Sequence, residues 1–233
     1  TVASAQPTVA GFQREPMTVA LSETPDGVIA PQALRELLPW LEWATTVALG
    51  PGLTTKPAAR AFVPALLDHW EGPLVLDADG LKIAGAHLDR LAERATPVVC
   101  TPHLGEASTL LQIPKEEIQR RRLETVLEAA AQQHLVLLLK GYRPITADPE
   151  GRASICVVGN PGLGTAGTGD VLTGIIGALL AQGLGPYDAA RVGAYLHGTA
   201  GDLAAEARGQ ISMVAGDVVD HLPGAIQGAI AAH

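Results

Sequence analysis

Short apolar runs alternate with longer amphipathic stretches along the first 140 residues, and this alternation limits the chain to a layered α/β fold. The runs are brief, rich in Val and Leu, and bounded by Gly, Pro or charged residues, which is typical of buried strands. They lie at 17–21, 46–50, 73–77, 97–101 and 135–139. The stretches between them predict helices at 31–43, 57–70, 86–94 and 114–133. Strands joined by helices pair in parallel, so the sequence predicts a mostly parallel sheet between helices.

The pattern changes after residue 140. The segments RPITA and ASICV, separated by the turn DPEG, predict an antiparallel strand pair. The remaining sequence predicts helices at 171–182, 187–208 and 215–231. No repeat, low-complexity linker or charge block divides the chain. We therefore expect residues 1–233 to form a single domain.

Charge and composition exclude several classes of protein. Aromatic residues make up only 3% of the chain, and the apolar remainder suits helices layered on strands. A net charge of -8 argues against binding to nucleic acid or to an anionic membrane. Two cysteines are too few for a disulfide framework, and no apolar run reaches the roughly 18 residues of a membrane span. We expect a soluble, cytoplasmic protein.

A glycine-rich turn, GNPGLGTAGTGD, occupies residues 159–170 directly before an apolar helix. Gly164, Gly167 and Gly169 lack Cβ atoms, so the backbone can take positive φ values and approach a ligand closely. Successive amides and the helix N-terminus can then converge on a phosphate. The spacing matches neither G-x-x-x-x-G-K-S/T nor a strand followed by G-x-G-x-x-G. The sequence therefore predicts a phosphate-binding turn of another kind.

Asp170 ends this turn, where phosphate oxygens would repel its carboxylate. A general base that awaits a hydroxyl proton would explain its presence. The alternative is that Asp170 only caps the helix and that the glycines form a tight connection.

Four other segments carry chemically suggestive residues just after predicted strands. They are GPGLT (50–54), LDADGL (76–81), TPHLGE (101–106) and KGYRP (140–144). Ligands bind at the carboxyl ends of strands in doubly wound sheets. We therefore expect these segments and the glycine turn to share one crevice.

Taken together, these segments resemble a known family. GNPGLGTAGTGDVLTGIIGALLAQG resembles the signature of the ADP/ATP-dependent NAD(P)H-hydrate dehydratases of the ribokinase-like superfamily. The resemblance continues in order through GPGLT, LDADGL, TPHLGEASTLL, LLKGYRPITADPEG, YLHGTAGD and GDVVDHLP. It implies a three-layer α/β/α fold with a mostly parallel central sheet. It also implies dehydration of the S-epimer of NADHX and NADPHX, the hydrated forms of NADH and NADPH, coupled to hydrolysis of ADP or ATP with Mg²⁺.

The resemblance assigns roles to individual residues. Asp170 takes the substrate hydroxyl proton, and the amides around Gly167, Thr168 and Gly169 stabilise the transferred phosphoryl group. Gly52 and His103, with Asp170, contact NAD(P)HX. The nucleotide is bound by Gly169 and by the KG segment, which comprises Lys140, Gly141, Tyr142, Arg143 and Pro144. The alternatives are that Gly52 is a plain turn glycine and that His103 is a loop histidine without a task.

Family members commonly form tetramers or larger homo-oligomers, and an epimerase domain is often fused ahead of this domain. The family pattern begins with a strand, a glycine-rich turn and a helix, so we expect this chain to lack the first β-α unit. On that expectation TVASAQPTVAGF enters at the following strand. Leu104, Pro144 and Ala166 depart from the family pattern, and Pro144 removes one backbone donor.

Three further residues receive other interpretations. Asp77 and Asp79 could hold Mg²⁺, but carboxylates at strand ends more often cap turns, so no protein metal ligand is predicted. His197 lies within an apolar helical pattern and is interpreted as a hydrogen-bonded core histidine.

Two other functions stay open from the sequence. One is a small-molecule kinase of the same superfamily, acting on a hydroxymethylpyrimidine, a thiazole or a sugar. The other is a catalytically silent nucleotide-binding subunit. The joint occurrence of GPG, PHLGE and KG favours the dehydratase.

Overall fold

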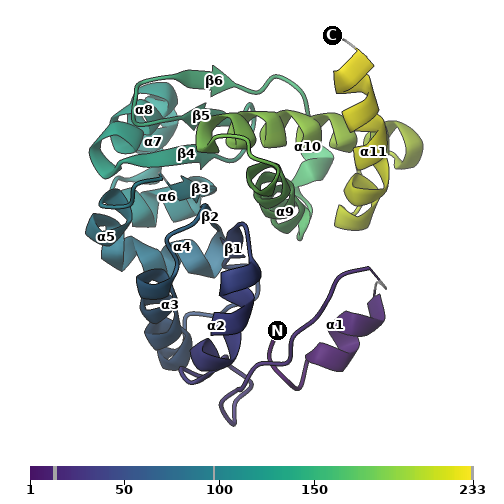
Figure 1. Ribbon diagram of the computed structural model, residues 1–233. Coiled ribbons are helices and arrows are strands. Elements are labelled where there is room, and N and C mark those ends of the chain that lie inside the picture. Colours follow the sequence, from purple (N-terminus) through teal and green to yellow (C-terminus); the bar gives the residue numbers. More distant parts are fainter. Residues whose placement is uncertain (13–14, 97, 232–233) are drawn as a thin grey trace.

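A six-stranded sheet forms the centre of the molecule in the computed structural model, which describes residues 1–12, 15–96 and 98–231 (Figure 1). The strands follow the order of the sequence: β1 (Val47–Leu49), β2 (Leu74–Leu76), β3 (Val98–Cys100), β4 (Leu135–Leu139), β5 (Ile145–Ala147) and β6 (Ala153–Ile155). Neighbours from β1 to β4 pair in parallel, whereas β5 pairs antiparallel with both β4 and β6. The predicted change from parallel to antiparallel pairing is confirmed.

The helices of the described residues surround this sheet, and most of them pack on its two faces (Figure 1). They are α1 (Gln6–Phe12), α2 (Ala33–Trp43), α3 (Pro57–His69), α4 (Ala78–Ala84), α5 (Leu88–Ala92), α6 (Leu104–Leu111), α7 (Lys115–Arg120), α8 (Arg122–Gln133), α9 (Thr168–Ala181), α10 (Pro186–Arg208) and α11 (Ala215–Ala231), with 3-10 turns η1 (Gly85–His87) and η2 (Pro161–Gly164). The predicted helices are present, although 114–133 is divided into α7 and α8, and 86–94 into η1 and α5. The sequence did not predict α1, α4 or α6, because seven or eight residues are too few to display a helical period.

Alternation along the strands produces two apolar layers. Val75, Val99 and Val136 point to one face and pack with residues of α9 and α10. Their neighbours Leu76 and Cys100 point to the other face, into a larger core that includes residues of α2 to α8. Successive side chains of a strand lie on opposite faces, so buried strands must be apolar throughout. The predicted three-layer α/β/α arrangement is confirmed.

The predicted strand at 17–21 is wrong. Within the described residues, Leu21 forms only an isolated parallel bridge with Val2, and 17–20 has no regular structure. A strand requires hydrogen-bonded neighbours along its length, and this segment has them only at residues 1–3. The expectation that TVASAQPTVAGF enters at a strand is also wrong, because Gln6–Phe12 forms α1, which buries no residue and lies apart from the sheet (Figure 1).

The predicted strand at 97–101 corresponds to β3, and its residue 97 lies outside the described residues. None of the helices in the described ranges is long and apolar enough to cross a membrane.

Candidate functional site

The loops that follow β1, β2, β3 and β4 are joined to one another at the carboxyl edge of the sheet. The amide of Thr101 donates to the carbonyl of Leu76, and the amide of Lys140 donates to the carbonyl of Pro102 at 2.8 Å. A Cβ on Gly50 would overlap the carbonyl oxygen of Asp77, so only glycine lets these two loops touch. These strand-end segments thus meet at one edge of the sheet. Of the five segments expected to share a crevice, the KG segment and the glycine turn line the cavity described below, so the crevice common to all five stays a prediction.

A buried ion pair lies at the middle of this edge. Oδ1 of Asp77 accepts from Nζ of Lys140 at 2.6 Å, and Oδ2 accepts from the hydroxyl of Thr173 at 2.8 Å. Asp77 is 1% exposed, so its charge must be compensated within the protein. The expectation that Asp77 caps a turn is wrong: it occupies the N-cap position of α4, but its side chain makes no capping bond.

The glycine turn brings backbone amides to the same place. Gly167 is the N-cap of α9 and has φ +87°, whereas Gly164 and Gly169 have no positive φ. A Cβ on Gly169 would lie 3.3 Å from Nζ of Lys140, so a larger residue there would require the ammonium to shift by a few tenths of an ångström. The first turn of α9 therefore lies next to this ammonium group, and a helix N-terminus beside a cation suits an anion.

The hydroxyl of Thr168 is used within the turn. It lies 2.6 Å from the carbonyl of Leu163 and 2.9 Å from that of Thr165, and both distances allow donation. The side chain of Thr168 therefore holds the turn closed, and its backbone amide donates to the carbonyl of Thr165 at 3.4 Å.

Asp170 lies in the first turn of α9, which begins two residues earlier, at Thr168. Capping does not explain this aspartate, because the N-cap is Gly167 and no side-chain cap bond forms there. Partial burial and the negative charge of Asp77 raise the pKa of Asp170, and the charge of Lys140 opposes them. A carboxylate whose pKa is raised is a stronger base, and its position beside an anion-binding turn suits proton abstraction.

A cavity of about 380 Å³ opens beside this turn. All five residues of the KG segment line it, as do Thr168 and Gly169 of α9. The rest of the lining consists of Val158, Gly159, Asn160, Pro161, Leu163, Gly164, Leu172, Ala194, His197 and Gly198. The structure thus brings together the two segments that the sequence predicted to bind a nucleotide.

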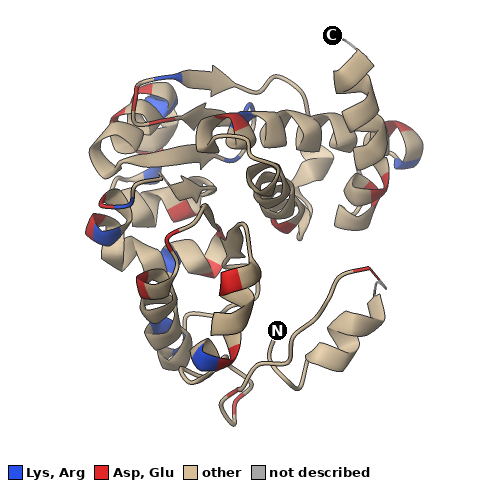
Figure 2. Cartoon of the chain, in the orientation of Figure 1, with Lys and Arg blue, Asp and Glu red and all other residues tan. Residues whose placement is uncertain are grey.

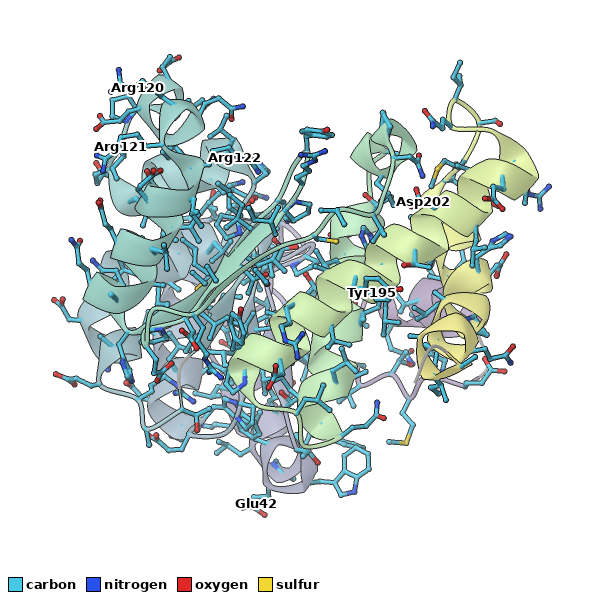
Figure 3. All side chains as sticks on the ribbon, turned by 90° about the horizontal axis from the view of Figure 1, so that it is seen from above. Glu42, Arg120, Arg121, Arg122, Tyr195 and Asp202 are labelled. Atoms are coloured by element: carbon cyan, nitrogen blue, oxygen red, sulfur yellow. The ribbon has the colours of Figure 1, made fainter. Side chains whose placement is uncertain are left out.

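Two side chains from outside the cavity hold its walls. Arg122 of α8 donates to the carbonyls of Tyr142 and Arg143 at 2.7 and 3.2 Å. Asp202 of α10 accepts from the amide of Gly159 at 2.8 Å and from the side chain of Asn160 at 3.0 Å. Figure 3 shows the two well apart, Arg122 on α8 and Asp202 on α10.

His197 combines a structural bond with a place in the cavity wall. Its Nε2 lies 2.9 Å from the carbonyl of Thr168, and since a carbonyl only accepts, Nε2 carries the proton. Burial lowers the pKa of His197, so the ring is neutral. The interpretation as a hydrogen-bonded core histidine is confirmed, but the apolar helical pattern gave no sign that the ring also lines the cavity.

The three residues predicted to bind the substrate, Gly52, His103 and Asp170, all lie outside this cavity lining. Gly52 has φ +73°, and a Cβ there would meet nothing within 4 Å, so its backbone conformation alone favours glycine. Nδ1 of His103 accepts from the amides of Gly105 and Glu106, while Glu106 accepts from the amide of His103. These bonds form a capping box at the start of α6, so the alternative that His103 is a loop histidine without any role is wrong.

Metal ligands do not gather at this edge. The described residues include no group of three His, Cys, Asp or Glu side chains that could hold an ion. Both oxygens of Asp77 have protein partners, and Asp79 pairs with Lys82 at 2.8 Å. The residues present therefore do not form a magnesium site of their own.

Positive charge at the site is local. Figure 2 shows basic residues interspersed with acidic ones on the helices and loops. Lys140, which is 19% exposed at its side chain, therefore provides the cationic group next to the turn.

Comparisons with known proteins identify the family of the chain. Residues 7–224 match the Carb_kinase family model, which is described as NAD(P)H-hydrate dehydratase. The chain belongs to the NAD(P)H-hydrate dehydratase family. The bifunctional NAD(P)H-hydrate repair enzyme Nnr of Moorella thermoacetica is 47% identical over 209 residues, which are 90% of this chain and 39% of that relative. The chain thus spans well under half the length of that relative.

Two solved structures resemble this chain over most of its length. One is an ADP/ATP-dependent NAD(P)H-hydrate dehydratase of Bacillus subtilis co-crystallised with ATP and Mg²⁺; it has a TM-score of 0.70 and 28% identity, and the match covers 85% of this chain and 76% of that one. The other is a ribokinase-like superfamily protein of Enterococcus faecalis, with a TM-score of 0.81 and 25% identity over 98% and 75% of the two chains. The ribokinase-like fold is confirmed.

Proposed function

We propose that this chain dehydrates the S-epimer of NADHX and NADPHX to NADH and NADPH, coupled to hydrolysis of ADP or ATP. One observation carries the proposal: the KG segment and the first turn of α9 line the same cavity, with Asp170 on that turn. Membership in the NAD(P)H-hydrate dehydratase family supports it. The named relative from Bacillus subtilis is ADP/ATP-dependent, which supports either nucleotide as co-substrate.

The proposed chemistry converts a poor leaving group into a good one. Asp170 removes the proton of the C6 hydroxyl of the hydrated ring as that oxygen attacks the terminal phosphorus. The bond to the remaining nucleotide breaks, and the amides of Gly167, Thr168 and Gly169 stabilise the charge of the phosphoryl group in transit. The C6–O bond then breaks with help from the ring nitrogen lone pair, phosphate leaves, and loss of a C5 proton restores the dihydronicotinamide.

The nucleotide is proposed to occupy the 380 Å³ cavity. Lys140 provides charge for the phosphates, Gly141 has φ +129° and bends the backbone, and Tyr142, Arg143 and Pro144 form the wall. Because the described residues hold no metal cluster, Mg²⁺ is proposed to arrive with the nucleotide phosphates rather than on protein carboxylates.

NAD(P)HX is proposed to approach Asp170 from the other side of the carboxyl edge, near Gly52 and His103. His103 is 60% exposed at its side chain, and Nδ1 is occupied as an acceptor. Its Nε2, which lies 3.4 Å from Oε1 of Glu106, is the nitrogen proposed to donate to a ligand. Gly52 leaves the space above the β1–α3 loop free of a side chain.

Assembly and location form a separate part of the proposal. We propose a single domain that works in the cytoplasm as a homo-oligomer of four or more copies. Exposed apolar side chains on α1 and α11 support association, among them Phe12 (80% exposed) and Ile230 (70%). Light scattering of the purified chain measures the oligomeric state, and a monomer would contradict this part. The relative from Moorella thermoacetica is bifunctional, which supports an epimerase as functional partner.

One assay separates the dehydratase from the two alternatives. Purified protein is incubated with NADHX and either ADP or ATP, while NADH absorbance and phosphate release are followed. A dehydratase gives NADH and phosphate in equal amounts. A small-molecule kinase leaves NADHX untouched and phosphorylates hydroxymethylpyrimidine, thiazole or sugar alcohols instead. A silent subunit binds the nucleotide and converts neither.

A further inference from the structure

We propose that Asp77 is a positioning residue, which holds the ammonium of Lys140 against the first turn of α9 and keeps it from pairing with Asp170. The inference rests on the proposed function, because it concerns the base and the cation of that reaction. Asp77 itself does not line the cavity, although it binds Lys140, which does, and it is not a catalytic residue.

Burial shows how firmly Asp77 is fixed. The residue is 1% exposed, and three elements converge on its carboxylate: β2, which it follows, β4, which ends next to Lys140, and α9, which carries Thr173. A buried carboxylate deprived of its partners carries a large desolvation cost. The pair is therefore retained in the free protein and is not formed only when a ligand binds.

The ammonium needs such an anchor. Lysine has a flexible four-carbon stem and three rotatable donors, so its position depends on its partner. A Cβ on Gly169 would lie 3.3 Å from Nζ of Lys140 and 3.8 Å from Oδ2 of Asp77, so both groups lie close to the first turn of α9. Asp77 thereby places a positive charge within reach of any phosphate that binds to these amides.

Asp170 follows Gly169 in the first turn of α9, and a Cβ on Gly169 would lie within 4 Å of both members of the pair. Asp77 raises the pKa of Asp170 and Lys140 lowers it, in addition to the larger effect of burial. The neighbouring histidine of α10, His197, is neutral because burial lowers its pKa, so it adds no charge. With Asp77 present, Lys140 is already paired. Without it, the freed ammonium would be attracted to Asp170 and would weaken the base.

A purely structural cross-link between β2, β4 and α9 is the competing explanation. It predicts that changes at Asp77 and at Thr173 destabilise the fold and leave the titration of Asp170 unaltered. The two explanations therefore differ in a measurable property of the unliganded protein.

The test compares Asp77→Asn with Thr173→Val, which removes one bond to Asp77 but keeps its charge. The pKa of Asp170 is measured by ¹³C NMR of its carboxyl carbon in the full chain without ligand, with Asp170→Asn to assign the signal. We expect Asp77→Asn to lower the pKa of Asp170 by about half a pH unit or more and Thr173→Val to leave it within experimental error. An unchanged pKa in Asp77→Asn overturns the inference, as does an equal shift in both variants.

Lys140→Met keeps the test decisive even if Asp77→Asn does not fold. Removal of the ammonium is expected to raise the pKa of Asp170, and no change would overturn the inference. In the enzyme assay, the acidic limb of the pH profile should move with the pKa in Asp77→Asn, and the KM for ADP should rise several-fold. If the wild-type chain does not dehydrate NADHX, the proposed function is refuted. The NMR result tests the role of Asp77 independently, because it is measured without ligand.

Discussion

Nζ of Lys140 lies 2.6 Å from Oδ1 of Asp77, although 63 residues separate the two in sequence. The pair joins the ends of β2 and β4 directly beneath the first turn of α9, where Thr173 adds a third contact. Its position explains why glycine stands at 169, and it places one positive and one negative charge next to the proposed base.

Asp170→Asn should abolish dehydration while the fold stays intact. The amide keeps the shape of the carboxylate but cannot accept the hydroxyl proton, and loss of a general base costs about 10²- to 10⁴-fold in turnover. NADH formation from NADHX and ADP measures it, with circular dichroism to check the fold. Asp188→Asn, which removes an exposed carboxylate on α10, is the matched control and should retain full activity. Near-normal turnover by Asp170→Asn would refute the role of the base.

The same substitution should stabilise the protein at neutral pH. The pKa of Asp170 is raised in the fold, so the folded state favours the uncharged form. The stability gained from this preference is present when the pH lies below the pKa of Asp170 in the unfolded chain. It is lost as the pH rises through the pKa of Asp170 in the folded chain. Asn mimics the uncharged form. We expect Asp170→Asn to have a higher Tm than the wild type at pH 7 and an equal Tm once the pH is below the unfolded pKa. A lower Tm at pH 7 would contradict the raised pKa.

As the pH is lowered, activity should fall at a higher pH than expected for an ordinary aspartate acting as the base. The base acts only when it is ionised, and its pKa is raised by partial burial and by Asp77. The midpoint of the acidic limb of kcat/KM should therefore lie above the pH at which an exposed aspartate titrates. If the midpoint of the acidic limb lies at or below that pH, another group controls the reaction.

Gly169→Ala and Gly174→Ala should separate catalysis from helix stability. Both glycines lie within α9, where alanine is favoured by about 0.5–1 kcal/mol. A Cβ at 174 meets nothing within 4 Å, so that variant should be more stable and fully active. A Cβ at 169 would press on Nζ of Lys140, so that variant should bind ADP at least about tenfold more weakly. Equal ADP affinity in the two variants, measured by calorimetry, would contradict the contact.

The sequence predicted the layers of this fold more successfully than the details of its site. Apolar runs of five residues identified β2, β3 and β4, because strands buried on both faces are apolar throughout. The strand at 17–21 was predicted wrongly for the same reason, since an apolar run does not reveal whether a hydrogen-bonding neighbour exists. The KG segment and the glycine turn were recognisable as motifs, and they do line one cavity.

Other features of the site depend on contacts between distant segments. Asp77 was predicted to be a turn cap because its lysine partner is remote in sequence. Asp202 drew no prediction, since its bonds to Gly159 and Asn160 also span more than 40 residues. His103 had a local signal, the acidic residue three positions later, but histidine is not among the common N-cap residues.

Asp202→Ala tests whether this distant contact shapes the nucleotide site. Loss of the carboxylate frees the amide of Gly159 and removes one hydrogen bond of the Asn160 side chain, which keeps its bonds to Gly201 and Gly162, so the cavity wall should loosen. We expect the KM for ADP to rise roughly three- to tenfold, equivalent to about 1 kcal/mol for lost hydrogen bonds, with little change in kcat. Glu206→Ala, farther along α10 and exposed, serves as the control. A parallel fall in kcat would assign Asp202 a role beyond the wall.

A crystal structure of the chain with a bound adenine nucleotide tests the central claim most directly. The account predicts that the terminal phosphate lies against the amides of residues 167–169, within reach of Nζ of Lys140, with the carboxylate of Asp170 facing the open side of that phosphate. A nucleotide bound elsewhere, or an Asp170 side chain turned away from the phosphate, would contradict it.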